Sequence, residues 1–169
     1  MINKKKLLFI SKLAEVPPIG SAKYAPGTIA SFVALIIGYF FLTIFNIFLY
    51  LSFIFIFIIF SYFLCEIHIK KHNKKDPKEI VIDEFIGQSI PIYLYEISHG
   101  TNKDPNEAII FYVVCFVLFR YFDIMKPFPV SYFDKKHKNS FGVIMDDVCA
   151  GLYVVLSLIC FMILKNFIL

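Results

Sequence analysis

Long hydrophobic runs alternate with short basic or turn-rich segments along this chain. No charged residue occurs between Ile29 and Cys65. Because a helix needs about 20 apolar residues to cross a bilayer, this run predicts two helices with a turn near Asn46. A membrane β-barrel would need alternating polar and apolar positions, which these runs lack. The full pattern predicts five helical segments, near residues 29–46, 49–66, 80–97, 108–119 and 148–164.

The amino-acid composition places these helices in a membrane. Hydrophobic residues make up 59% of the 169 positions, and 21 of them are Phe, whereas soluble domains are about 45–50% apolar. A soluble domain of this size has too little interior to bury so many apolar side chains. We therefore predict an all-α fold, a small membrane bundle of four or five apolar helices that forms a single domain over residues 1–169.

The basic residues predict the orientation of the bundle. If the N-terminus is cytoplasmic and all five segments cross, only Lys103 and Lys165 of the 17 Lys and Arg residues fall outside, in accord with the positive-inside rule. The number of crossings stays open, because 80–97 and 108–119 can also form a re-entrant pair. The net charge of +4 suits loops that lie against anionic headgroups. Without a nucleic-acid-binding motif, it predicts no nucleic-acid partner.

Acidic residues occur at the ends of three apolar segments, all at the predicted cytoplasmic rim of the bundle. Ionisable groups beside apolar helices are costly, which makes them candidates for function. Clustered carboxylates need a counter-charge, and Mg²⁺ prefers oxygen ligands. The predicted metal ligands are Asp83, Glu84, Asp123, Asp146 and Asp147.

Cationic and small residues near these carboxylates indicate a site for an anion. Arg120 and Lys126 flank Asp123. A guanidinium matches a phosphate with two N–H groups, and an ammonium supplies a compact charge. Gly27 and Thr28 follow a proline at the start of the first apolar segment, where first-turn N–H groups can bind an anion. Carboxylates for a metal beside cations for an anion predict a metal-assisted phosphate site.

Each acidic pair also has a purely structural interpretation. Asp83 and Asp146 can be helix N-caps, with Glu84 and Asp147 favoured in the first turn by the helix dipole. This interpretation explains any one pair. It does not explain why three groups from distant segments meet on one side of the membrane beside two cations, so we favour the site.

Three local patterns predict how the chain is arranged near the site. Gly87 and Gly151 each follow an acidic residue by four positions, a spacing that shares one helix face and permits close helix approach. Residues 126–129, Lys-Pro-Phe-Pro, predict a stiff extended segment. His68 and His72 are four residues apart, a spacing that can hold a metal, but the lysines between them favour a solvated helix end.

Four segments resemble signature segments of the phosphatidylglycerophosphatase A family: residues 25–28, 80–87, 120–129 and 142–151. The resemblance covers about residues 20–155. It is most specific in Arg-x-Phe-Asp-x-x-Lys-Pro-x-Pro and Ile-Met-Asp-Asp-x-x-Ala-Gly. It implies a Mg²⁺-dependent phosphatase of the bacterial cytoplasmic (inner) membrane. The implied substrate is phosphatidylglycerophosphate, an intermediate of phospholipid biosynthesis, and the implied active site faces the cytoplasm.

The predicted reaction is hydrolysis of a phosphomonoester by in-line attack of water. Asp83, Glu84 and Asp147 are the predicted catalytic residues, with Glu84 or Asp147 accepting the proton of the water. Arg120 and Lys126 are predicted to hold the phosphate. One alternative is a phospholipid headgroup transferase, whose compact aspartate motif does not occur in this sequence. The other is a non-enzymatic membrane protein that handles ions or protons, which would carry its charges near mid-span.

Overall fold

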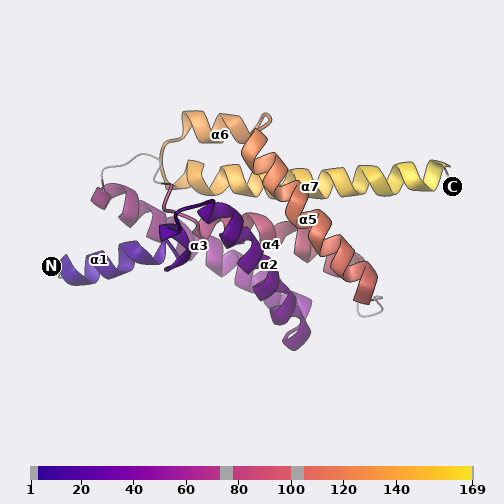
Figure 1. The fold of residues 1–169 in the computed structure, drawn as a ribbon, viewed down its shortest axis with the longest axis horizontal. Helices are drawn as coiled ribbons and strands as arrows, with labels where there is room; N and C mark the ends of the chain where they lie inside the picture. Colours follow the sequence, from indigo (N-terminus) through magenta and orange to yellow (C-terminus); the bar gives the residue numbers. More distant parts are fainter. Residues whose placement is uncertain (1–3, 73–77, 100–104, 169) are drawn as a thin grey trace.

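The computed structural model describes residues 4–72, 78–99 and 105–168, and this part of the chain is helical without a strand (Figure 1). Its elements are α1 (Lys4–Leu13), the short 3-10 helix η1 (Ile19–Ser21), α2 (Pro26–Ile44), α3 (Ile47–His72), α4 (Ile82–His99), α5 (Pro105–Met125), α6 (Val130–Lys136) and α7 (Ser140–Ile168). The predicted all-α bundle is confirmed. The five predicted segments correspond to α2, α3, α4, α5 and α7, whereas the hydrophobic pattern did not indicate α1 and α6.

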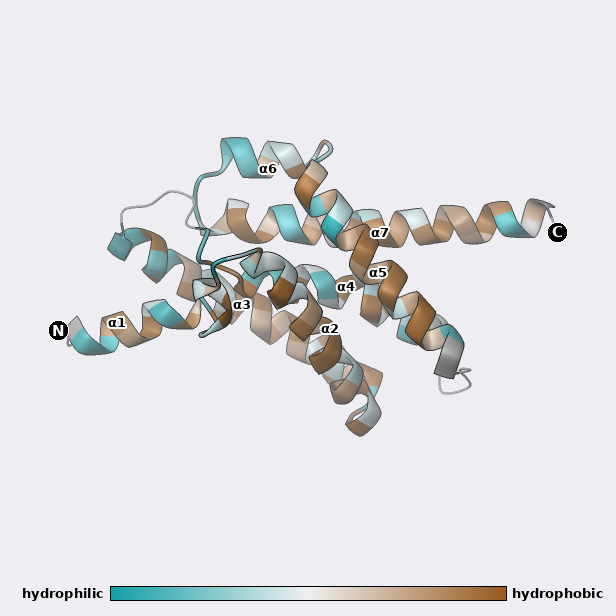
Figure 2. Ribbon diagram, in the orientation of Figure 1, coloured by the Kyte–Doolittle hydropathy of each residue, from teal (hydrophilic) through white to brown (hydrophobic). Residues whose placement is uncertain are grey.

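Four of the described helices are long and apolar enough to cross a membrane. They are Pro26–Ile44, Ile47–His72, Glu107–Met125 and Ser140–Lys165. Large side chains such as Phe40, Phe55 and Phe161 are more than half exposed on their surfaces, and Figure 2 shows hydrophobic residues along most of α2 and α5. Side chains of this kind are stable against lipid and unfavourable in water, so the chain is a membrane protein.

Helix α4 lies at the centre of the bundle and packs against α2, α3, α5 and α7. It is not one of the four candidate spans. Acidic residues interrupt its apolar sequence, with Asp83 and Glu84 in its first turn, while Ile86, Gln88 and Ile92 are buried. Neighbouring helices therefore cover a helix whose charged end would be costly against lipid.

Helices α4 and α7 approach each other closely at two glycines. A Cβ atom at Gly151 would lie 2.5 Å from the carbonyl oxygen of Gly87. A Cβ atom at Gly87 would lie 2.7 Å from the carbonyl oxygen of Asp147. Both distances are too short for a side chain, so the two backbones are in contact. The predicted role of the small residues in close helix approach is confirmed, and the contact places the first turns of α4 beside Asp147.

Helix α7 begins at Ser140, well before the predicted boundary at residue 148. Asn139 caps it, because its Oδ1 accepts a hydrogen bond from the Gly142 N–H at 3.0 Å and its carbonyl accepts one from the Val143 N–H at 3.1 Å. The N-cap interpretation of Asp146 is therefore wrong. Asp146 lies inside the helix, where the backbone N–H groups are bonded to carbonyls of the preceding turn. Its carboxylate is therefore not needed as a cap and can make tertiary contacts.

Candidate active site

A cavity of about 360 Å³ lies where the first turns of α2 and α4 meet the end of α5 and the first half of α7. Residues of α6 and of adjoining loops complete its wall. Every residue for which the sequence predicted a site role lines this cavity: Gly27, Thr28, Asp83, Glu84, Arg120, Asp123, Lys126, Asp146 and Asp147. The fold thus brings these residues together from four segments of the sequence, while their individual roles stay predictions.

Arg120 forms an ion-pair network in the wall of the cavity. Its Nη1 lies 2.6 Å from Oε2 of Glu84 and 3.0 Å from Oδ2 of Asp123. The hydroxyl of Ser31 donates a hydrogen bond of 2.9 Å to the same Glu84 oxygen, and Arg120 Nη1 donates one of 3.2 Å to Ser31 Oγ. Charge-assisted contacts of this length are strong where little water reaches them. They connect α2, α4 and α5 and hold the Glu84 carboxylate in place.

Lys126 forms a second ion-pair network in the same cavity, with Asp134 and Asp146. Its Nζ donates hydrogen bonds of 2.7 Å to Oδ1 of Asp134 and 2.8 Å to Oδ2 of Asp146. Although burial alone would lower the pKa of Lys126, the two carboxylates raise it above its ordinary value. The residue is therefore a permanent cation at the edge of the cavity.

Three of the five predicted metal ligands form a tight group. One carboxylate oxygen each from Glu84, Asp123 and Asp147 lies within 4.8 Å of the others. Asp83 and Asp146 line the same cavity outside this group, and Asp146 is the residue bound to Lys126. Three oxygen donors at this spacing are suited to a hard divalent cation.

The environment of the first turn of α4 disfavours the charged forms of its two carboxylates, Asp83 and Glu84. Burial raises the pKa of Asp83 well above its usual range, and the charges of Glu84 and Asp146 raise it further. Burial and the charge of Asp123 raise the pKa of Glu84 to about 7, although Arg120 and Ser31 oppose the shift. Arg120 and Lys126 do not neutralise all the carboxylates that line the cavity, so the site favours an additional positive charge.

Gly27 is required where the start of α2 meets Glu84. Helix α2 begins at Pro26 without a side-chain cap, so the N–H groups of its first turn have no acceptor within the helix. A Cβ atom at Gly27 would lie 2.1 Å from Oε1 of Glu84 and 3.4 Å from Nη1 of Arg120. The missing side chain therefore gives Glu84 the position in which it reaches both Arg120 and Ser31.

Two site residues, Ser31 and Asp134, were not predicted from the sequence. Ser31 carried a usable signal, because it follows Gly27 by four positions and so shares its face of α2. Asp134 carried none, because residues 126–129 were predicted to form a stiff extended segment. That expectation is wrong: Lys126 has a φ of 45°, and the chain turns directly into α6, which packs on α7. This packing brings Asp134 to Lys126.

Replacing Gly27 with Ala is expected to lower the catalytic activity of the site by about 100-fold, because a displacement of Glu84 by about 1 Å disturbs the whole Arg120 network. Thermal unfolding should change little, since the displaced atom is the end of a flexible side chain. Gly38→Ala is the matched control, because it makes the same change in α2 beside Tyr50 and Ile92, away from the cavity. Equal turnover in the two variants would contradict this role of Gly27.

One family model and two relatives of this chain share one description. The family model for Phosphatidylglycerophosphatase A matches residues 12–162. Phosphatidylglycerophosphatase A of Haemophilus influenzae is 36% identical over 132 residues, 78% of this chain and 76% of that protein. The Escherichia coli protein of the same name is 30% identical over 132 residues, 78% of this chain and 71% of its own length.

A third relative has a different description. A Bacteroides thetaiotaomicron protein, provisionally named as a phosphatidylinositol-3-phosphatase, is 39% identical over 80 residues, 47% of this chain and 45% of that protein. No solved structure matches the chain.

Proposed function

The chain belongs to the phosphatidylglycerophosphatase A family and is a phosphatase, and on this basis we propose that it hydrolyses phosphatidylglycerophosphate to phosphatidylglycerol and phosphate in phospholipid biosynthesis, with Mg²⁺ as its cofactor. The observation that carries the proposal is the single cavity lined by Glu84, Asp123 and Asp147 together with Arg120 and Lys126. Carboxylates and cations on one wall fit a metal ion and a phosphate side by side.

The residues of the cavity fit Mg²⁺. The donors of the tight group are all carboxylate oxygens, contributed by Glu84, Asp123 and Asp147, which is the ligand chemistry that Mg²⁺ prefers. Their mutual repulsion is relieved by a divalent cation, which supports the same assignment. When bound, the ion would supply positive charge next to the phosphoryl oxygens of the substrate.

The two cations of the cavity are proposed to bind the phosphate. Lys126 uses two of its three N–H donors for Asp134 and Asp146, which leaves one for a phosphate oxygen. Arg120 lines the same cavity, and its guanidinium carries N–H donors beyond those of Nη1, which contacts Glu84, Asp123 and Ser31. The N–H groups of Gly27 and Thr28 at the start of α2 add dipoles directed at an anion.

Two of the carboxylates have different proposed roles in the reaction. Glu84 is held by Arg120 and Ser31, so we assign it to positioning the guanidinium and the metal. Asp147 accepts the proton of the attacking water, while the new oxygen–phosphorus bond forms in line with the glycerol oxygen that departs. The glycerol oxygen takes a proton from solvent, and inorganic phosphate leaves.

We further propose that the cavity faces the cytoplasm of a bacterial cell, at the inner membrane. Lys78 and Lys138 lie in its wall, and the last turn of α3 carries Lys70 and Lys71. Basic residues at this end of the bundle support a cytoplasmic position through the positive-inside rule. The lipid substrate would thus enter with its headgroup at the inner leaflet.

The test is phosphate release by the purified protein in detergent, with phosphatidylglycerophosphate, phosphatidic acid, lysophosphatidic acid and phosphatidylinositol 3-phosphate compared. We expect the highest kcat/KM for phosphatidylglycerophosphate. Removing metal with EDTA should lower the rate at least about 100-fold, because several kcal/mol of transition-state stabilisation is lost, and added Mg²⁺ should restore it. A preference for another lipid would contradict the proposed substrate. Activity that resists EDTA would contradict the proposed cofactor, and headgroup exchange without phosphate release would contradict the proposed reaction.

A further inference from the structure

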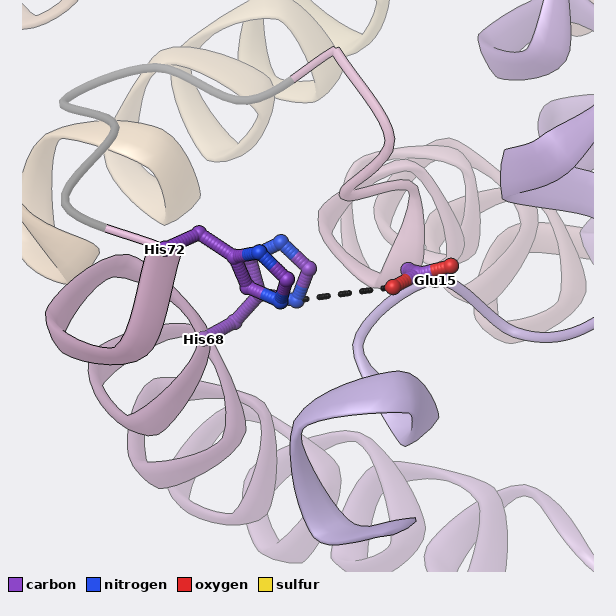
Figure 3. Close-up of side chains that lie close together, drawn as sticks. All are labelled: Glu15, His68 and His72. Carbon is purple, nitrogen blue, oxygen red and sulfur yellow. Dashed lines mark ion pairs between the residues drawn. The ribbon is translucent and has the colours of Figure 1, made fainter. Parts of the chain in front are cut away.

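A second group of potential metal ligands lies outside the cavity, between α1 and the end of α3 (Figure 3). It consists of Glu15, just after α1, with His68 and His72 in the last two turns of α3. One imidazole nitrogen of each histidine and one carboxylate oxygen of Glu15 lie within 4.8 Å of one another. The two imidazole rings stack with their centroids 4.5 Å apart, and Figure 3 shows the Glu15 carboxylate directed at them.

The fold holds His68 in an orientation suited to a metal ligand. The side chain is buried, and its Nδ1 forms a hydrogen bond of 2.9 Å with the carbonyl oxygen of Ser11. The same Nδ1 lies 3.8 Å from Oε1 of Glu15. In the tautomer that carries its proton on Nδ1, Nε2 keeps the lone pair that a metal needs. A hydrogen bond from the other ring nitrogen to a carbonyl is usual in metal-binding histidines.

The lysines between the histidines are bound to other groups. Lys70 Nζ lies 2.8 Å from Oε1 of Glu66, and Lys71 Nζ donates a hydrogen bond of 2.8 Å to Ser11 Oγ. Helix α1 packs on α3 and is bonded to it both by Lys71 and by His68, so the position of Glu15 beside the histidines depends neither on a metal nor on Lys71 alone. The group is built before any ion binds.

We propose that Glu15, His68 and His72 bind a transition-metal ion, with Zn²⁺ the expected occupant. Two imidazoles and one carboxylate are a zinc ligand set that leaves a fourth position for water. Imidazole suits Zn²⁺, Ni²⁺ and Co²⁺, whereas Mg²⁺ prefers oxygen. The site is therefore chemically distinct from the carboxylate group in the catalytic cavity.

Occupancy of this site would stabilise the segment that supports the catalytic cavity. The carbonyl oxygen of Ala14, the neighbour of Glu15, accepts a hydrogen bond of 3.2 Å from the Val81 N–H, and Ile80 and Val81 line the cavity. The ion would join this segment to α3, and Zn²⁺ should therefore raise the melting temperature of the protein through binding to the native state.

The experiment is isothermal titration of the purified full-length protein, prepared without a polyhistidine tag, with Zn²⁺ in excess Mg²⁺. We expect one tightly bound Zn²⁺ per chain. His72→Ala, a change at an exposed position, and Glu15→Gln should each weaken Zn²⁺ binding at least about 100-fold through loss of a direct ligand. Thermal unfolding without metal verifies that the variants fold, and their melting temperatures should no longer rise with Zn²⁺.

Two control variants distinguish loss of a ligand from loosened helix packing and from binding in the catalytic cavity. Lys71→Ala removes a contact between α1 and α3 but no ligand, and Asp123→Asn alters the catalytic carboxylate group. Both variants should bind Zn²⁺ within about threefold of the wild type, since neither loses a ligand. Unchanged affinity in His72→Ala and Glu15→Gln, or loss of binding only in Asp123→Asn, would overturn the proposal, as would a wild-type protein that does not bind Zn²⁺.

Discussion

Replacing Asp147 with Asn is expected to lower phosphate release at least about 1000-fold. Asp147 is only 3% exposed and belongs to the tight carboxylate group with Glu84 and Asp123. Asn keeps the size of the side chain but removes the charge that would hold a cation and the oxygen that would accept a proton. Electrostatic groups at reaction centres contribute about 100- to 1000-fold each, and Asp147 is proposed to supply two such functions.

The measurement is kcat for phosphatidylglycerophosphate at saturating Mg²⁺, with thermal unfolding as a test of folding. Glu96→Gln is the matched control. It removes a carboxylate from the same α4 helix that carries Glu84, but Glu96 bonds to the Tyr112 hydroxyl at 2.7 Å and does not line the cavity. This variant should keep turnover within about threefold, as expected for a residue that does not contact the reacting atoms. Wild-type turnover in a folded Asp147→Asn protein would refute the role proposed for this residue.

The convergence of carboxylates was predictable because each lies at an end of an apolar segment, and the basic residues place these ends on one side of the membrane. The hydrophobic pattern places Asp83, Asp123 and Asp147 close to segment ends, although the helices α5 and α7 extend beyond the predicted boundaries. The basic loops indicate which ends lie together. Helices that cross a bilayer place their ends at its two surfaces, so the pattern limits where the acidic residues at those ends can lie. The cavity wall therefore follows from the sequence, although the distances between its atoms do not.

The partners of the cations were not predictable from the same pattern. Asp134 reaches Lys126 only because the chain turns after Lys126, whose φ is 45°, and folds α6 back onto α7. Sequence propensity favoured an extended Lys-Pro-Phe-Pro segment, and the tertiary packing of Val130, which is fully buried, outweighs it. Such turns depend on contacts between distant residues.

The start of α7 and the central position of α4 were likewise not predictable from the hydrophobic pattern. The apolar run of α7 begins at residue 148, yet the Asn139 cap extends the helix to Ser140. Helix α4 is less apolar than the four candidate spans, because its sequence contains Asp83, Glu84 and Glu96. Its close contact with α7 at Gly87 and Gly151 depends on tertiary packing that the pattern does not show. The second group of potential metal ligands was not predictable either, since Glu15 lies far from His68 and His72 in the sequence.

Arg120→Lys is expected to lower kcat/KM about 100-fold, the largest effect after that of Asp147→Asn. Lysine keeps the charge but cannot hold Glu84, Asp123 and Ser31 with one planar group, as Nη1 of Arg120 does at 2.6, 3.0 and 3.2 Å.

The Lys variant tests whether the site needs geometry or only positive charge. The measurement is kcat and KM, compared with those of Lys126→Arg. Because Lys126 makes single hydrogen bonds to two separate carboxylates, another cation can replace it with a loss of about tenfold or less. If geometry governs the Arg120 site, its kcat falls as the Glu84 carboxylate loses its position. Equal, small losses in both variants would mean that charge alone matters, and the network around Arg120 would then serve stability and not catalysis.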